Sequence, residues 1–71
     1  MAKVGQITEH ERIRRLRGLS VTEMALETAF SHSYVSQVEG GYLPPSGRYR
    51  AAAARVLGLP VEAIFPEVTR G

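Results

Sequence analysis

The sequence predicts an all-α protein, a compact bundle of five short helices in one domain. Two capping boxes support this fold class, because Ser20 with Glu23 and Thr8 with Glu11 can satisfy the free amides at the start of a helix. Glycines follow three of the expected helices, at positions 18, 40–41 and 58, where they act as helix stops. Four consecutive alanines, residues 51–54, add strong helix propensity.

The first half of the chain is expected to form three of these helices. After the Thr8 cap, the first runs to about residue 17, with Ile13 and Leu16 on its inner face. The second starts at about residue 21 and lasts about two turns, because weaker helix formers and a new cap follow at 28–31. The third spans roughly residues 32–39 and stops at the two glycines.

The second half predicts two more helices. Ser46 caps a helix over 47–57, and Gly58 ends it. Pro60 fits the first turn of a fifth helix, which Pro66 closes. The domain is therefore expected to span 8–66, between a flexible N-terminal arm, residues 1–7, and a short tail, residues 67–71.

Composition narrows the class of protein. A 71-residue chain buries only roughly 60% of its unfolded surface, so it needs tight helix packing or a partner. Cysteine is absent, and no apolar run approaches the roughly 20 residues that span a bilayer, so we expect a soluble, cytoplasmic protein that makes no membrane contact. The net charge is only +2, but four of the nine basic residues lie within residues 12–17. This clustering favours nucleic-acid binding more than the total does.

The stretch from residue 18 to 41 organises the rest of the chain. Its two short helices, joined by a turn of three or four residues, form a helix-turn-helix whose second helix is sized for the major groove of DNA. Within that second helix, Val35 and Val38 share one face. The opposite face is short, polar and able to hydrogen-bond: His32, Ser33, Ser36 and Gln37.

Many positions of the chain, from about residue 12 to 65, match a known pattern in register and without a gap. They are Leu19-Ser20, Glu23-Met24-Ala25, Phe30-Ser31, Val35-Ser36, Val38-Glu39, Gly41, Pro45-Ser46 and residues 54–58. The chain resembles the phage repressor and Cro-like (XRE-type) helix-turn-helix family. The resemblance implies a lambda-repressor-like fold, a repressor-like transcriptional regulator of bacterial or phage origin, and a structural ion pair between Arg14 and Glu39. Family members commonly read two-fold DNA sites as dimers.

The polar face of the third helix supplies the candidate base-reading residues, His32, Ser33, Ser36 and Gln37. Gln37 is the best of them, because its amide can donate to and accept from the N6 and N7 edge of adenine, although it could instead bond a neighbouring side chain. Candidate phosphate contacts are Arg12, Arg15, Arg17, Ser31, Tyr34, Tyr42 and Arg48. The competing interpretations are pairing of Arg12, Arg15 and Arg17 with Glu9 and Glu11, and a packing role for the Tyr42 ring.

Some positions depart from the family pattern. Val21 replaces a glutamine that often meets DNA, and the non-basic residues 42–44 replace a basic grip on the backbone. Ala29 replaces the glycine of the turn, where a left-handed conformation costs roughly 1 kcal/mol, so a somewhat different turn is expected. Thr28 occupies a usual core position and Leu26 an exposed one.

The expected core is thin and rich in small residues, so a second subunit could cover part of the fifth helix. Its members are Ile13, Leu16, Leu19, Met24, Ala25, Phe30, Val35, Val38, Ala53, Ala54, Leu57, Leu59, Ile64 and Phe65.

Catalysis and metal binding are not expected. His10 and His32 are the titratable candidates, but the serines beside His32 are sequence neighbours on a helix, which do not face it as a nucleophile faces its base. Two histidines without cysteine make a poor metal set, and no glycine-rich phosphate loop is present. No cofactor is therefore expected.

Two functions remain open. One is a DNA-binding regulator that acts as a homodimer on double-stranded DNA. The other is an antitoxin or regulatory adaptor on the same fold, whose third helix is covered by a protein partner. Val21, the uncharged third helix and the non-basic residues 42–44 favour the second. Ser33, Ser36 and Gln37 favour the first, since a packing interface would more often present apolar anchors.

Overall fold

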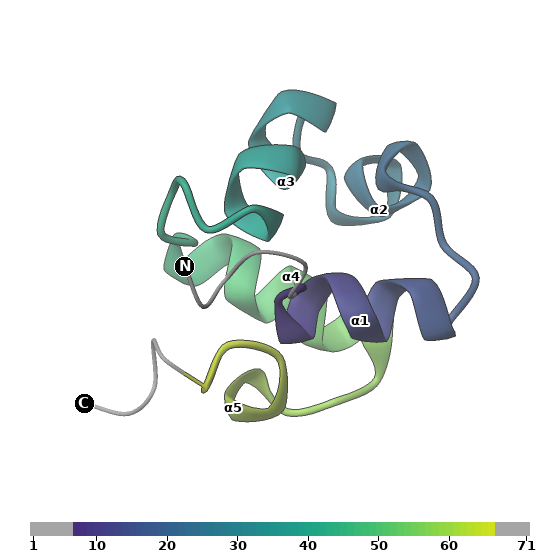
Figure 1. The fold of residues 1–71 in the computed structure, drawn as a ribbon, viewed down its shortest axis with the longest axis vertical. Coiled ribbons are helices and arrows are strands. Elements are labelled where there is room, and N and C mark those ends of the chain that lie inside the picture. Colours follow the sequence, from purple (N-terminus) through teal and green to yellow (C-terminus); the bar gives the residue numbers. More distant parts are fainter. Residues whose placement is uncertain (1–6, 67–71) are drawn as a thin grey trace.

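The computed structural model describes residues 7–66. Within this part of the chain the protein is an all-α bundle, as predicted (Figure 1). Its helices are α1 (Glu9–Leu16), α2 (Val21–Thr28), α3 (His32–Glu39), α4 (Gly47–Leu57) and α5 (Val61–Ile64). Residues 1–6 of the predicted arm and the predicted tail, 67–71, lie outside the described residues.

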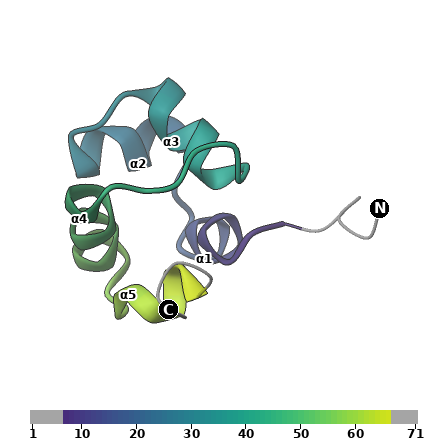
Figure 2. The same cartoon turned by 90° about the vertical axis from the view of Figure 1, so that its left-hand side faces the viewer.

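The helices enclose a central core. α2 packs against both α3 and α4, α4 packs against α5, and α5 packs against α1 (Figure 2). α3 lies with α2 at one end of the molecule, while α1 and α5 lie toward the other (Figure 1). No helix in the described part of the chain is long and apolar enough to cross a bilayer.

Side-chain caps begin four of the helices. Ser20 forms the complete predicted capping box with Glu23, whose carboxylate accepts from the Ser20 amide at 2.8 Å. The box predicted at α1 is only half formed: Thr8 Oγ1 accepts from the Glu11 amide, but the Glu11 carboxylate pairs with Arg15. The serines before α3 and α4 cap those helices. Pro60 was predicted to lie in the first turn of α5. Instead it is the extended residue directly before the helix, which begins at Val61.

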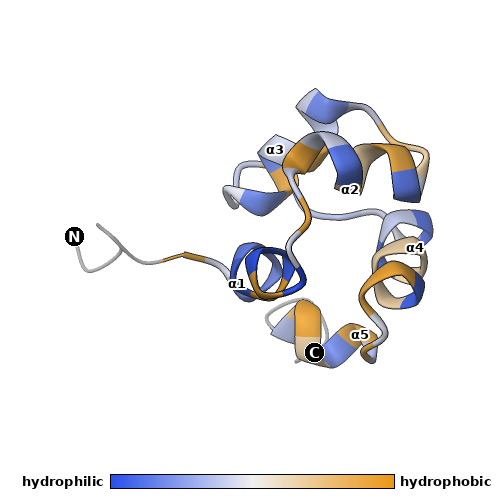
Figure 3. Ribbon diagram, turned by 90° about the vertical axis from the view of Figure 1, so that its right-hand side faces the viewer, coloured by the Kyte–Doolittle hydropathy of each residue, from blue (hydrophilic) through white to orange (hydrophobic). Residues whose placement is uncertain are grey.

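The prediction that Leu16 faces the core is wrong. Leu16 is 71% exposed, and the inner face of α1 consists of His10, Ile13 and Arg14. At about 100° per residue, Leu16 lies about 120° around the helix from His10. The error arose because two of the three inward residues are polar, so α1 is mostly hydrophilic along its length (Figure 3).

The core also contains larger side chains than predicted. Tyr49 is fully buried and meets the Phe30 ring edge-on, with ring centroids 5.1 Å apart. Tyr34 and Phe65 complete an aromatic cluster around it. The expected core omitted Tyr49 and Ala52, and four of its members are only partly buried: Leu19, Phe30, Ala54 and Leu59. The remaining members, apart from Leu16, are buried.

The turn between α2 and α3 keeps its left-handed residue despite the alanine. Ala29 has φ 64° and ψ 33°, so the expectation of a different turn is wrong. This conformation lets the Phe30 amide bond to the Ala25 carbonyl at 3.0 Å and closes the end of α2. Thr28 is buried and Leu26 is 75% exposed, as predicted.

Candidate nucleic-acid interface

α3 presents one polar face to solvent. His32, Ser33, Ser36 and Gln37 are all exposed. Val35 and Val38, on the opposite face, are buried in the core. Three-residue and four-residue spacing therefore gives α3 one anchored side and one side free to meet a partner.

Gln37 and Ser33 are one helical turn apart and are hydrogen-bonded. Gln37 Nε2 donates to Ser33 Oγ at 3.2 Å, which is a bond at the long end of the normal range. A bond to a neighbouring side chain is the alternative that the sequence left open for Gln37, and here it places the amide over the exposed face of α3. Both groups are exposed, so water or a ligand can replace this contact at little cost.

The N-terminal end of α3 is joined to the start of α4. The Tyr34 hydroxyl accepts a hydrogen bond from the Ser46 amide at 3.0 Å, and the Tyr34 ring packs on Phe30. Arg48, in the first turn of α4, lies 5.6 Å from the centre of the Phe30 ring. An exposed guanidinium therefore lies close to the positive end of α3, which Ser31 caps.

Tyr42 lies at the other end of α3. Its amide donates to the Gln37 carbonyl at 2.9 Å, and its side chain is 85% exposed. A Cβ atom added at Gly40 would lie 2.8 Å from the Tyr42 ring, so the glycine is what allows the ring to lie against the end of the helix. The Tyr42 ring thus lies against the end of α3 with most of its surface exposed, and the packing role and the phosphate contact remain alternatives.

The three arginines predicted to contact phosphate in and just after α1 have partners within the protein. Arg12 pairs with Glu9 at 2.6 Å, and Arg15 pairs with Glu11. Arg17 Nε donates at 3.1 Å to the carbonyl of Leu57, the last residue of α4. Because α4 meets α3 at its opposite end, Arg17 is roughly 15 Å along α4 from that contact. The pairing of Arg12 and Arg15 with Glu9 and Glu11 is the alternative that the sequence left open.

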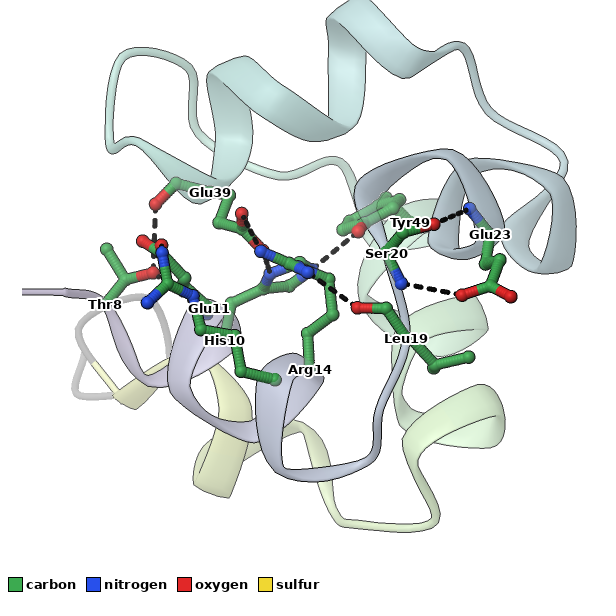
Figure 4. Close-up of polar contacts among 10 residues, drawn as sticks. Thr8, His10, Glu11, Arg14, Leu19, Ser20, Glu23, Glu39 and Tyr49 are labelled. Carbon is green, nitrogen blue, oxygen red and sulfur yellow. Dashed lines mark hydrogen bonds and ion pairs between the residues drawn. The ribbon is translucent and has the colours of Figure 1, made fainter.

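Arg14 and Glu39 meet across α1 and α3 in a buried, bidentate pair (Figure 4). Arg14 Nε donates to Glu39 Oε2 at 2.6 Å, and Nη2 donates to Oε1 at 2.9 Å. The third guanidinium nitrogen, Nη1, donates to the Leu19 carbonyl at 2.6 Å. Arg14 therefore connects the C-terminal end of α3 to the segment that leads into α2.

The environment of Glu39 keeps it ionised. Burial by itself would raise its pKa, but hydrogen bonds from His10 and Arg14 and the charge of Arg14 outweigh burial and lower the pKa to about 2. The hydrogen bond to Glu39 likewise raises the pKa of Arg14. The two groups are thus a permanent ion pair at neutral pH.

His10 and Tyr49 extend this pair, although neither was predicted to have a role at the candidate site. His10 Nδ1 lies 2.9 Å from Glu39 Oε2, and Nε2 lies 2.6 Å from the Tyr49 hydroxyl (Figure 4). Thr8 Oγ1 adds a bond to the Glu39 carbonyl at 2.9 Å. The four-residue spacing of His10 and Arg14 could have indicated that His10 shares the inward face of α1 with Arg14. No sequence pattern near Tyr49 indicates that it lies beside these two residues.

Comparison with protein families finds a match to a helix-turn-helix domain over residues 11–64. The chain belongs to the helix-turn-helix domain family. The match agrees with the resemblance to XRE-type regulators. Comparisons with curated proteins and with solved structures give no match.

Within this helix-turn-helix domain, α2, the turn at 29–31 and α3 form the motif itself. Membership of the family points to a DNA-binding regulator. No group of three or more His, Cys, Asp or Glu side chains within residues 7–66 is arranged to hold a metal ion.

Proposed function

We propose that this helix-turn-helix domain is a sequence-specific, repressor-like transcriptional regulator that inserts α3 into the major groove of double-stranded DNA. The observation that carries the proposal is the exposed row of hydrogen-bonding side chains on α3, opposite a face buried in the core. A regulator of this kind acts where the DNA is, in the cytoplasm of a bacterial cell.

His32, Ser33, Ser36 and Gln37 are the proposed base-reading residues. Gln37 is the most discriminating, since an amide can pair with adenine through two hydrogen bonds while a serine hydroxyl accepts several partners. The contact of the Gln37 amide with Ser33 is compatible with this role, because it lies on the exposed face of α3, where a base edge can replace it at little cost.

Phosphate contacts are proposed first for the groups at the two ends of α3. Arg48, Ser31 and Tyr34 lie together at the N-terminal end, where the helix dipole favours an anion, and Tyr42 lies at the C-terminal end. Arg12 and Arg15 can contribute only by leaving their carboxylate partners, and Arg17 only by leaving α4. We therefore rank these three below Arg48.

We further propose that the protein binds DNA as a symmetric homodimer. One helix-turn-helix covers too few base pairs for high specificity, so a two-fold site with half-sites about one helical turn apart is expected. Leu16, Leu26 and Tyr42 have large side chains that are mostly exposed, and contacts between subunits would cover apolar surface of this kind.

The same exposed apolar side chains support a second candidate function. An antitoxin or regulatory adaptor would use them to bind a protein partner, and Leu26 lies on α2, within the helix-turn-helix motif. Such a partner would cover α3 and would not require DNA.

Selection of bound duplexes from a random pool separates the two functions. The proposed regulator enriches a two-fold sequence with half-sites about one turn apart. Enrichment of no sequence would refute the regulator and leave the protein-binding function. Enrichment of a single half-site, with a one-to-one complex in sedimentation, would refute the dimer alone.

A further inference from the structure

A buried polar network lies at the C-terminal end of α3. His10 of α1 is 2% exposed and lies between Glu39 of α3 and Tyr49 of α4, which is fully buried. Among the described residues, no buried side-chain nitrogen or oxygen lacks a hydrogen-bond partner. The network is therefore complete as it stands, and each hydrogen in it can be assigned from chemistry.

The acceptors in the network determine where the hydrogens lie. Ionised Glu39 can only accept, so His10 Nδ1 must carry a hydrogen and donate it. Within residues 7–66, the only hydrogen bond of the Tyr49 hydroxyl is the one to His10 Nε2. If Nε2 also carried a hydrogen, the hydroxyl hydrogen of Tyr49 would be buried without an acceptor. Tyr49 therefore donates to an unprotonated Nε2.

This chain of two bonds adds a polar connection between α3 and α4 at the C-terminal end of α3. α3 packs chiefly on α2, and the Tyr34 ring near its N-terminal end meets the Tyr49 ring of α4, with ring centroids 5.4 Å apart. Tyr34 bonds to Ser46 at the N-terminal end of α3, and Glu39 connects through His10 to Tyr49 at the other. Both ends of α3 are thus attached to α4, one directly and one through His10.

We infer that His10 is a positioning residue for the recognition helix: by donating through Nδ1 to Glu39 and accepting from Tyr49 through Nε2, it fixes the C-terminal half of α3 on α4. The inference rests on the proposed DNA-binding function and goes beyond the pairing of Arg14 with Glu39. Gln37 lies two residues before Glu39, so the position of the Gln37 side chain depends on where this end of α3 is held.

The competing role for His10 is simple packing. Its ring contacts the rings of Tyr49 and Phe65, with centroids 5.7 and 5.6 Å away. His10→Phe keeps an aromatic ring and removes both hydrogen bonds. His10→Asn keeps a donor at the same number of bonds from Cα as Nδ1 and so restores the bond to Glu39 alone. Tyr49→Phe removes only the hydroxyl.

The first measurement needs no DNA. Nitrogen chemical shifts of the His10 ring in the wild-type protein at neutral pH should show a protonated Nδ1 and an unprotonated Nε2. Amide exchange reports on the end of α3 through the Gly40 and Tyr42 amides, which bond to carbonyls of residues 36 and 37. His10→Phe should speed their exchange about tenfold relative to amides of α2, with His10→Asn in between. An unprotonated Nδ1, or unchanged exchange in His10→Phe, would overturn the inference.

The second measurement is affinity for the selected duplex and for a random duplex, with every variant shown to be folded at the temperature used. His10→Phe should weaken binding to the selected site about tenfold and leave random-duplex binding unchanged, while His10→Asn should recover part of the loss. Equal affinity of wild type and His10→Phe for the selected site contradicts the positioning role. If His10→Phe does not fold, both measurements are made on Tyr49→Phe and His10→Asn instead. A wild-type protein without sequence preference refutes the proposed function, and the exchange data then decide the role of His10 alone.

Discussion

Glu39 at the end of α3 and Arg14 in α1 form a bidentate ion pair, with nitrogen–oxygen distances of 2.6 and 2.9 Å, and both residues are buried. The pair joins the helix that carries the candidate reading face to the helix that begins the domain. Removing one partner leaves the other as an uncompensated buried charge, which is costlier than losing the pair as a whole.

Arg14→Ala should therefore lower the free energy of unfolding by roughly 3 to 5 kcal/mol. The matched control is Arg15→Ala, because Arg15 is the next residue on the same helix and its pair with Glu11 is exposed on the arginine side. That pair should contribute no more than about 1 kcal/mol. Urea unfolding of the two variants makes the comparison, and equal losses would mean that Arg14 has no special role.

The lowered pKa of Glu39 predicts a loss of stability in acid. The folded-state pKa of about 2 lies below the ordinary value of 4.5, so the stabilisation is complete above about pH 5 and is lost as the pH falls toward 2. The loss should amount to roughly 3 kcal/mol. Unfolding free energies measured across this range should fall less steeply in Glu39→Gln than in wild type. Glu62→Gln, a change on the exposed surface of α5, is the control and should keep the wild-type slope.

Ala29 offers a substitution that should stabilise the protein. Its left-handed backbone, φ 64°, costs an alanine roughly 1 to 2 kcal/mol, and glycine adopts it freely. The larger entropy of an unfolded glycine offsets part of this gain, so Ala29→Gly should raise the free energy of unfolding by about 0.5 to 1 kcal/mol. Gly58→Ala, at φ 70°, is the reverse experiment and should destabilise. A destabilised Ala29→Gly protein would show that the turn is not strained.

The parts of the fold that were predicted correctly from the sequence depend on local patterns. The box of Ser20 with Glu23, the stops at Gly18 and Gly58, and the buried face of Val35 and Val38 depend on residues within one turn of each other, and all were predicted. Leu16 was misplaced because apolar character is a poor guide on a helix whose inward residues include a histidine and an arginine.

The parts that escaped prediction depend on distant contacts. Tyr49 is 39 residues from His10, and Arg48 of α4 lies over Phe30 in the turn between α2 and α3, so no local sequence pattern predicts either contact. The resemblance identified Arg14 and Glu39 because the family repeats that pair. It gave no guidance on His10, which was weighed only as a titratable group for catalysis.

Binding should be electrostatic but only moderately sensitive to salt, because few exposed cations lie beside α3. The slope of log affinity against log salt should correspond to about 3 to 5 phosphates per subunit. Arg48→Ala should reduce that slope by about 1 and weaken all sequences alike. Arg12→Ala is the control, since Arg12 is already paired with Glu9, and it should change the slope less. If Arg12→Ala reduced the slope more than Arg48→Ala, the phosphate contact would have to be assigned to α1.

The central claim is that the exposed face of α3 reads DNA sequence through Gln37. Affinities of wild type and Gln37→Ala should be measured on the selected site and on a complete set of its single-base variants. If Gln37 reads a base, its removal costs roughly 1 to 3 kcal/mol on the selected site and abolishes the preference at one base pair in each half-site, with the other positions unchanged. A Gln37→Ala protein that retained the wild-type preference at every position would contradict the account and place the reading face elsewhere.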